Sequence, residues 1–197
     1  ILSGLVGSEM CIRDSNEMVK FCHSLEIDLN DAIRCAATKP FGFQAFYPGP
    51  GVGGHCIPID PNYLSYRVRA ELGYSFKFVE LAQEINASMP AYVVSRIQEE
   101  LNALELPLKS SRILIAGVTY KKDVADMRES PALPLAELLI DKGAQVSYLD
   151  PFVPSWNVGG VAVPVSKPDA WVADAYDCIV ILQHHDAFST LPFSTAS

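Results

Sequence analysis

The sequence lacks the paired cysteines and the positive charge that mark several large classes of protein. Its five cysteines form no Cys-x-x-Cys pair, so their spacing predicts neither a disulfide framework nor a structural zinc site. A reducing, cytoplasmic location is therefore expected. The net charge of −8 comes from 15 basic and 23 acidic residues, and an acidic chain repels phosphate backbones, which argues against nucleic acid as a general partner.

The sequence also lacks an apolar run long enough to span a membrane, because runs such as residues 113–118 have only the length of a strand. A hydrophobic content of 49% against 19% charged residues instead predicts folded structure over most of the chain. Residues 1–15 do not match the pattern that follows, and no basic leader precedes their short apolar run. We therefore expect residues 1–15 to be a cloning or sequencing remnant rather than a signal peptide.

Residues 16–106 repeat their apolar side chains at helical spacing, which predicts an all-α central domain. Long helices are expected at residues 63–72 and 78–104, the second kinked or split at Pro90. Residues 41–60 are dense in glycine and proline, which predicts a loop. An ordered loop would require its aromatic side chains to be buried: Phe41, Phe43, Phe46 and Tyr47.

Residues 107–197 alternate apolar strands with an amphipathic helix, which predicts a Rossmann-like parallel sheet and makes the fold class α/β overall. The expected elements are strands at 112–118, 144–149 and 177–182, a short strand at 161–165, and helices at 133–142 and 170–175. The polar, patternless residues 189–197 lead us to expect that this domain is incomplete at its C-terminus.

The most informative stretch is a glycine-rich run that ends in a cysteine: Tyr47-Pro-Gly-Pro-Gly-Val-Gly-Gly-His-Cys-Ile-Pro-Ile-Asp-Pro61. The glycines let the backbone approach a ligand and offer N–H groups to an anion. No Walker lysine follows the run and no strand precedes it, so it is neither a P-loop nor a dinucleotide fingerprint. Cys56 is a candidate nucleophile, and Asp60 could orient water or accept a proton. The alternative is that Cys56 is simply a small buried residue.

A second candidate site follows the first expected strand of the α/β domain. Lys121, Lys122 and Arg128 bring three cations to the carboxyl end of that strand, where parallel sheets bind ligands and where phosphate would be attracted. Ser130 and Pro131 can begin the next helix, with the serine as its cap. The alternative is a solvated charged loop of the kind common after strands.

These two motifs resemble those of the UDP-glucose/GDP-mannose dehydrogenase family. The segment Thr38-Lys-Pro-Phe-Gly-Phe and the run around Cys56 are most similar to the UDP-N-acetylglucosamine or UDP-N-acetylmannosamine 6-dehydrogenases. The segment from Tyr120 to Pro131 is similar to a second family motif, and the resemblance covers about residues 16–188.

The resemblance implies NAD-dependent oxidation of a nucleotide-sugar C6 alcohol to a carboxylate in two hydride transfers. Cys56 would form a thiohemiacetal and then a thioester, which water hydrolyses with help from Asp60. The implied substrate-binding residues are Tyr47, Gly49, Gly51, Val52, Gly53, Gly54, Tyr120, Lys121 and, reaching a neighbouring subunit, Lys39. The implied cofactor-binding residues are Cys56, Ile57, Pro58, Ile59 and Arg128. Asp126 is expected to hold its loop rather than a ligand.

The family's N-terminal NAD-binding domain and an upstream catalytic lysine and asparagine have no counterpart here, so we expect this chain alone to be inactive. A homodimer through the all-α domain is expected, because the helical domain would otherwise leave apolar surface uncovered. Two alternatives stay open: a non-catalytic nucleotide-sugar-binding or dimerisation module, and UDP-glucose as the substrate. His184 and His185 are interpreted as structural, and no metal site is predicted.

Overall fold

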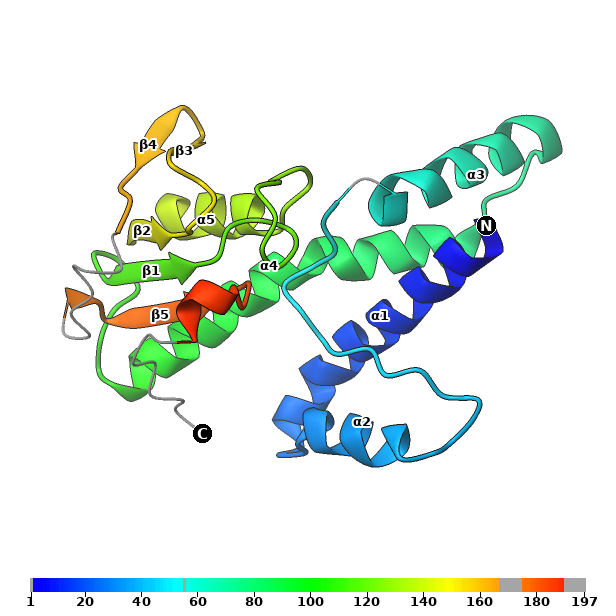
Figure 1. The fold of residues 1–197 in the computed structure, drawn as a ribbon, viewed down its shortest axis with the longest axis horizontal. Helices are drawn as coiled ribbons and strands as arrows, with labels where there is room; N and C mark the ends of the chain where they lie inside the picture. Colours follow the sequence, from blue (N-terminus) through cyan, green and yellow to red (C-terminus); the bar gives the residue numbers. More distant parts are fainter. Residues whose placement is uncertain (1, 55, 167–174, 190–197) are drawn as a thin grey trace. The chain divides into compact units, whose positions relative to one another are not determined.

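The computed structural model describes residues 2–54, 56–166 and 175–189. Contacts divide the chain into two compact units, Ile1–Tyr92 (unit 1) and Val93–Ser197 (unit 2) (Figure 1). The division falls within one helix, whereas the boundary expected at 106/107 marks the change from helical to α/β sequence and stays a prediction. Most of the short helix expected at 170–175 lies outside the described residues.

Unit 1 is helical, as the apolar spacing predicted. Its elements are α1 (Leu2–Ser24), α2 (Leu29–Ala37), α3 (Cys56–Leu72) and the first part of α4 (Lys77–Ala103). The first helix begins well before Asn16, so residues 2–15 continue the helix that the sequence predicts from Asn16. That residues 1–15 are a remnant stays a prediction.

The second helix shows how local sequence sets an element boundary. The side chain of Asp28 caps α2 by accepting a hydrogen bond from the backbone N–H of Asp31, at 3.1 Å. Leu29 and Ile33, one turn apart, point from α2 into a small core with Cys22 of α1. The structure therefore places the N-cap of α2 at Asp28.

The glycine-rich segment differs from the prediction in two ways. The expected loop to Asp60 is too long, because α3 already begins at Cys56. Pro58 is compatible with this start, since N–H groups in the first turn of a helix have no intrahelical acceptor. The burial that an ordered loop would require is found in part at Phe46, which is half-buried, but not at Phe41, which is 73% exposed, or at Tyr47, which is 50% exposed.

The long helix α4 is continuous through Pro90, so the predicted alternative of a split is wrong. A proline removes one helical hydrogen bond, and the burial of Met89 and Val94 on either side favours continuing the helix. The predicted apolar stripe is only partly buried, because Leu81 and Leu104 at its edges are exposed.

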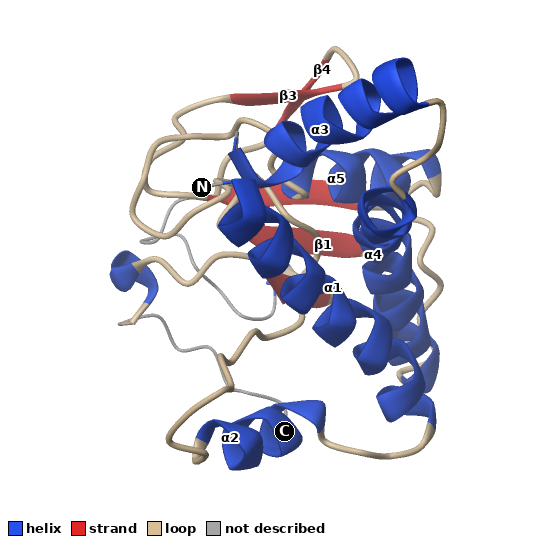
Figure 2. Cartoon of the chain, turned by 90° about the vertical axis from the view of Figure 1, so that its right-hand side faces the viewer, coloured by secondary structure: helices blue, strands red, loops and turns tan. Residues whose placement is uncertain are grey.

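Unit 2 contains the predicted parallel sheet. Its strands are β1 (Arg112–Ala116), β2 (Gln145–Leu149) and β5 (Cys178–Ile181), in the order β2-β1-β5, and all pairs are parallel. Helix α5 (Ala132–Asp141) connects β1 to β2 and lies alongside the strands drawn in red in Figure 2. β1 is thus central, which explains why its sequence is apolar without alternation.

The two faces of β1 enter different apolar clusters, as the two-residue period of a strand requires. Ile113 and Ile115 pack in the larger cluster with Leu135 and Leu139 of α5. The last part of α4 adds Val94, Ile97 and Leu101 to the same cluster. Leu114 and Ala116 face the other way, into a smaller cluster with Leu149 and Phe188.

A short hairpin was only half predicted. The strand expected at 161–165 is β4 (Val161–Val163), but its antiparallel partner β3 (Trp156–Val158) was missed. The signal was present in the Gly159-Gly160 pair, whose φ angles of 56° and 81° suit the two-residue turns that join antiparallel strands.

Candidate functional site

The loop after β1 begins at a glycine that no other residue can replace without strain. Gly117 has a φ of +78°, and a Cβ added there would lie 2.5 Å from the carbonyl oxygen of Gln183. The backbone N–H of Gly117 donates to Leu149 O at 2.8 Å. The ends of all three parallel strands therefore meet closely at this point, where such sheets bind ligands.

The three predicted cations of this loop differ in their availability. Lys122 Nζ lies 2.5 Å from a carboxylate oxygen of Asp186. The guanidinium of Arg128 forms a salt bridge with Asp126, with 2.7 Å between Nη2 and Oδ2. By contrast, Lys121 is exposed, and its ammonium group forms no salt bridge among the residues that the structure describes. Lys121 is therefore the cation best placed to meet an anionic ligand.

Asp126 holds its loop, as expected. Its side chain accepts from the backbone N–H of Arg128 at 3.0 Å, and its carbonyl oxygen accepts from the N–H of Tyr120 at 3.0 Å. The hydrogen bonds from the Arg128 side chain are the main cause that keeps the pKa of Asp126 below its usual value. Arg128, the predicted cofactor contact, is thus exposed but already paired.

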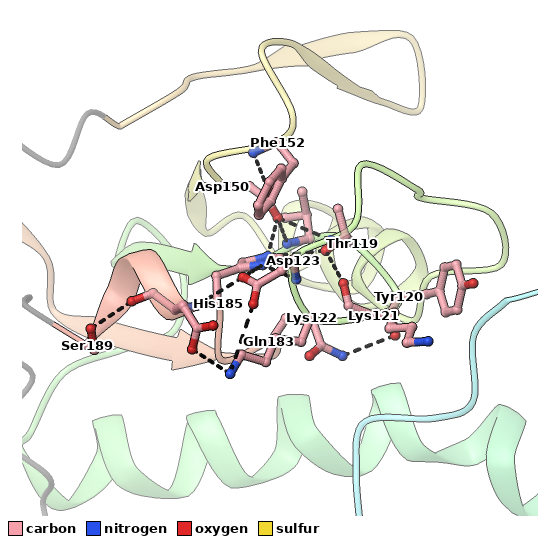
Figure 3. A network of polar contacts seen from close by, with 12 residues as sticks. Thr119, Tyr120, Lys121, Lys122, Asp123, Asp150, Phe152, Gln183, His185 and Ser189 are labelled. Carbon is pink, nitrogen blue, oxygen red and sulfur yellow. Dashed lines mark hydrogen bonds and ion pairs between the residues drawn. The ribbon is translucent and has the colours of Figure 1, made fainter.

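The backbone of the Tyr120–Lys121 segment is fixed from several sides (Figure 3). Gln183 Nε2 donates to the carbonyl oxygen of Tyr120 at 3.1 Å, and Thr119 Oγ1 donates to that of Lys121 at 3.1 Å. Ser130 Oγ donates to Val118 O at 2.7 Å and accepts from the N–H of Ala132. The N-cap position itself is Pro131 rather than Ser130, so the helix begins at Ala132, one residue after the predicted start at Pro131 and one before the predicted range 133–142.

Beneath this segment lies a buried polar network that the sequence analysis missed (Figure 3). Asp150 Oδ2 accepts from the N–H of Val118 at 2.7 Å and lies 3.1 Å from His185 Nε2. His185 Nδ1 accepts from the N–H of Asp123 at 3.0 Å. The side chains of Asp150 and His185 are both 0% exposed. The structural interpretation of His185 is therefore consistent with its burial, whereas His184 is exposed.

In unit 1, the glycine loop is attached to a buried asparagine. Asn16 Oδ1 accepts from the backbone N–H of Gly49 at 2.8 Å, while Asn16 Nδ2 donates to Asn86 Oδ1 at 2.8 Å. Asn16 is 0% exposed, and nothing in its sequence context separated it from other helix residues. Gly51 and Gly54, with φ angles of 138° and 92°, are the loop positions where glycine is conformationally required.

Helix α3 relates the two predicted catalytic residues. Cys56 is the first residue of α3, and Asp60 follows four residues later, so the two positions lie on the same face of the helix, one turn apart. This arrangement differs from the prediction from sequence, in which a loop extends as far as Asp60.

The remaining predicted residues of unit 1 differ in exposure. Gly49, Gly51, Val52 and Gly53 are half-buried and Gly54 is buried. Lys39 is exposed, with Nζ 5.4 Å from the centre of the Phe41 ring. Ile57 and Pro58 lie in the first turn of α3, followed by the half-buried Ile59.

Two kinds of site are absent from the part of the chain that the structure describes. No group of three or more histidine, cysteine, aspartate or glutamate side chains within residues 2–54, 56–166 and 175–189 is placed to hold a metal ion. Among the described helices, none is long and apolar enough to cross a membrane.

Unit 2, with polar groups gathered at the carboxyl ends of parallel strands, has the architecture of a nucleotide-binding α/β domain. The chain belongs to the UDP-glucose/GDP-mannose dehydrogenase family: residues 8–88 match the family's central domain and residues 114–197 match its UDP binding domain. This confirms the family resemblance drawn from the two sequence motifs.

Similar proteins extend beyond this chain. A UDP-N-acetyl-D-mannosamine dehydrogenase of Methanococcus maripaludis is 38% identical over 177 residues, which are 90% of this chain but 38% of that protein. A UDP-N-acetyl-D-glucosamine 6-dehydrogenase of Pseudomonas aeruginosa is 30% identical over 179 residues, which are 89% of this chain and 41% of that protein. The solved UDP-D-ManNAc dehydrogenase of Pyrococcus horikoshii superposes with a TM-score of 0.81 at 28% identity, over 97% of this chain and 42% of that one. The chain thus spans about two fifths of these relatives.

Proposed function

We propose that this chain supplies the thiol nucleophile and the nucleotide-binding unit of an NAD-dependent nucleotide-sugar 6-dehydrogenase. The single observation that carries the proposal is the position of Cys56. It is the first residue of α3, directly after the glycine turn, and Asp60 lies one helical turn further on. The family membership of both units supports the same conclusion.

The chemistry assigned to Cys56 uses two properties of sulfur. A thiolate adds to the C6 aldehyde of the sugar, forming a carbon–sulfur bond and an oxyanion that takes up a proton. After oxidation of this adduct, the resulting thioester is hydrolysed by water: the carbon–sulfur bond breaks, and the thiolate leaves. Asp60 is assigned the removal of a proton from that water. Backbone N–H groups of the glycine loop are assigned to the sugar and a phosphate.

The oxidations need a hydride acceptor, and the two domains that this chain matches are the central and the UDP binding domain. The glycine run has the spacing of a dinucleotide fingerprint but follows no strand, and Arg128 is paired with Asp126. NAD is therefore proposed as the cofactor of the whole enzyme. We expect this chain alone to form no NADH from UDP-GlcNAc, and clear turnover would contradict that expectation.

Unit 2 is proposed to bind the UDP part of the substrate through Tyr120 and Lys121. The loop backbone is fixed by Gln183, Thr119 and Asp126, and Lys121 is left with its charge available. Such an arrangement suits a nucleoside diphosphate, whose negative charge a lysine attracts as a point charge.

The proposed substrate class is a UDP-N-acetylhexosamine. Relatives named UDP-N-acetyl-D-mannosamine dehydrogenase and UDP-N-acetyl-D-glucosamine 6-dehydrogenase support this class over UDP-glucose. A homodimer through unit 1 is also proposed, since α3 and α4 expose Tyr63, Tyr66 and Phe78, each at least 60% exposed. A strictly monomeric chain in light scattering would count against the dimer.

Residue-resolved alkylation tests the role of the thiol. Iodoacetamide is expected to modify Cys56 faster at pH 7 than the exposed Cys35, which provides the internal control within the same chain. UDP-GlcNAc is expected to slow modification of Cys56 and to leave Cys35 unchanged. Equal rates for the two cysteines, with no protection by ligand, would favour the alternative of a non-catalytic binding module.

UDP binding tests the role of unit 2 separately. Lys121→Ala is expected to weaken UDP binding about 10-fold, the effect of losing roughly one charge-assisted contact. Lys122→Ala is the matched control: it also removes one positive charge from the loop, but a charge already paired with Asp186. Equal losses in both variants would show that only the overall charge of the loop matters.

A further inference from the structure

The loop that carries Tyr120 and Lys121 is fastened to a buried histidine that none of the functional assignments uses. His185 follows β5, and its side chain is fully buried, with the ring centres of Phe152 and Phe188 at 5.1 Å and 5.2 Å from its own. Close packing of a buried ring restricts the directions in which its two nitrogen atoms point. Each nitrogen contacts the loop after β1 (Figure 3).

The contact at Nδ1 determines which nitrogen carries the proton. The backbone N–H of Asp123 donates to Nδ1 at 3.0 Å, and a backbone N–H can only donate. Nδ1 must therefore present a lone pair, so the ring is neutral and Nε2 carries the hydrogen. That hydrogen points to Asp150 Oδ2 at 3.1 Å and to Thr119 Oγ1 at 3.2 Å.

From Nε2, a chain of hydrogen bonds reaches the proposed ligand residue. Thr119 Oγ1 accepts from His185 and donates its own hydrogen to the carbonyl oxygen of Lys121, at 3.1 Å. Asp150 Oδ2, the other neighbour of Nε2, accepts the N–H groups of Val118 and Thr119. Through Asp150, His185 is linked to the backbone N–H groups of Val118 and Thr119, and through Thr119 it is linked to the carbonyl group of Lys121.

From Nδ1, the histidine holds the far end of the same segment. Asp123 adopts a φ of +56°, a conformation that a residue other than glycine keeps only where its surroundings enforce it. Two contacts enforce it here: its N–H bonds His185, and its Oδ1 accepts from the N–H of Asp186 at 3.0 Å. The turn that closes the segment after Lys122 is therefore shaped by the imidazole.

We propose that His185 is a positioning residue for nucleotide binding, whose neutral ring, protonated on Nε2, holds residues 118–123 in the conformation that presents Tyr120 and Lys121 to a nucleoside diphosphate. The inference rests on the proposed role of unit 2. His185 touches no ligand and acts through the loop. Its loss is expected to lower UDP affinity more than the accompanying loss of stability accounts for.

The test is a titration of the intact chain with UDP, together with thermal unfolding, for four histidine variants. His185→Leu removes both polar contacts. His185→Asn places an acceptor near the position of Nδ1, and His185→Gln places a donor near that of Nε2. His184→Asn, at the exposed neighbouring histidine, is the control. His185→Leu is expected to raise the Kd of UDP more than about 10-fold, and each amide variant is expected to recover part of the affinity.

A stability control separates positioning from general weakening. Val163→Ala, in the β3–β4 hairpin, removes buried apolar atoms away from the loop and is expected to lower Tm without changing the Kd of UDP. Hydrogen exchange at the Asp123 amide gives an independent readout and is expected to accelerate in His185→Leu and His185→Gln but not in Val163→Ala. If His185→Leu does not fold, the two amide variants carry the test.

The outcomes are distinct. If the unchanged chain binds UDP and folded His185 variants bind it equally well, the positioning role is overturned while the proposed function stands. If Val163→Ala raises the Kd as much as the histidine variants at equal Tm, the role is also overturned. If the unchanged chain does not bind UDP, the proposed function of unit 2 fails, and the inference fails with it.

Discussion

The two loops that carry the proposed function differ in how their side chains hold them. The loop after β1 in unit 2 is fastened by buried or half-buried side chains that follow two other strands: Asp150 after β2, and Gln183 and His185 after β5. The described contacts of the glycine loop in unit 1 come from α1, through Asn16 to Gly49 and Ser15 to Phe46. The first loop is therefore built as part of a core, whereas the second depends on glycine geometry and a few attachments.

The difference has a physical meaning for ligand binding. A loop held by many satisfied buried hydrogen bonds loses little conformational entropy when a ligand binds, because its conformation is already fixed. The glycine loop leaves the side chain of Tyr47 50% exposed, and exposed segments adjust their shape more readily than buried ones. We therefore expect preorganised binding of the nucleotide and adjustable contact with the sugar.

The largest expected loss of stability comes from a substitution at Gly117, the first residue of the loop after β1. Gly117→Ala places a Cβ 2.5 Å from Gln183 O at a φ of +78°, and should destabilise unit 2 by about 3 kcal/mol or more. Gly160→Ala is the matched control, with a φ of +81° but no atom within 4 Å of the added Cβ, and should cost about 1 kcal/mol. Urea unfolding measures both. Equal losses would mean that backbone conformation alone, and not close packing against Gln183, decides the effect.

The second prediction breaks the attachment of the glycine loop. Asn16→Ala leaves the N–H of Gly49 and the amide of Asn86 without their partner, at a cost of about 2 kcal/mol. Hydrogen exchange at the Gly49 amide should accelerate. Asn86→Ala keeps the bond from Gly49 to Asn16 and should change this exchange rate less. An unchanged rate in Asn16→Ala would show that other contacts hold the loop.

A third, smaller effect tests the helix that precedes the glycine loop. Asp28→Ala removes the cap of α2 and should cost about 1 kcal/mol, because the N–H of Asp31 loses its acceptor. Asn30→Ala, two residues away and exposed, should be nearly neutral. Thermal unfolding followed by circular dichroism compares the pair. A larger loss for Asn30→Ala would contradict the assigned cap.

The smallest expected effect concerns the start of the sheet in unit 2. Hydrogen bonds from Arg112 lower the pKa of Asp177 below its usual value of 3.8. A carboxyl group whose pKa is lower in the folded state stabilises the fold above its unfolded pKa, and this contribution is lost as the pH falls through the folded pKa. The stability difference between the wild type and Asp177→Asn should therefore be present at pH 6 and shrink below about pH 4. In an Arg112→Gln background the pH dependence should become smaller but persist in part, because the backbone N–H of residue 112 still donates to Asp177.

The sequence predicted the elements of the fold better than the contacts of the site. Helical spacing and the buried strand at 112–118 were sufficient because apolar burial repeats along the chain, and the parallel sheet was confirmed. The helical start at Cys56 was missed because the prolines at positions 58 and 61 argued for a loop. Roles such as those of Asn16, Asp150 and His185 depend on partners 32 to 62 residues away, and no local pattern encodes such pairs.

The turn between β3 and β4 is a suitable position for attaching a chemical label. Nothing lies within 4 Å of the positions that a Cβ would take at Gly159 and Gly160, so this tip can accept a chemical label without disturbing its surroundings. A fluorophore attached at this point would remain connected to β2 through the pairing of Tyr148 with Val165, and so would follow the motion of the sheet rather than that of a free tail.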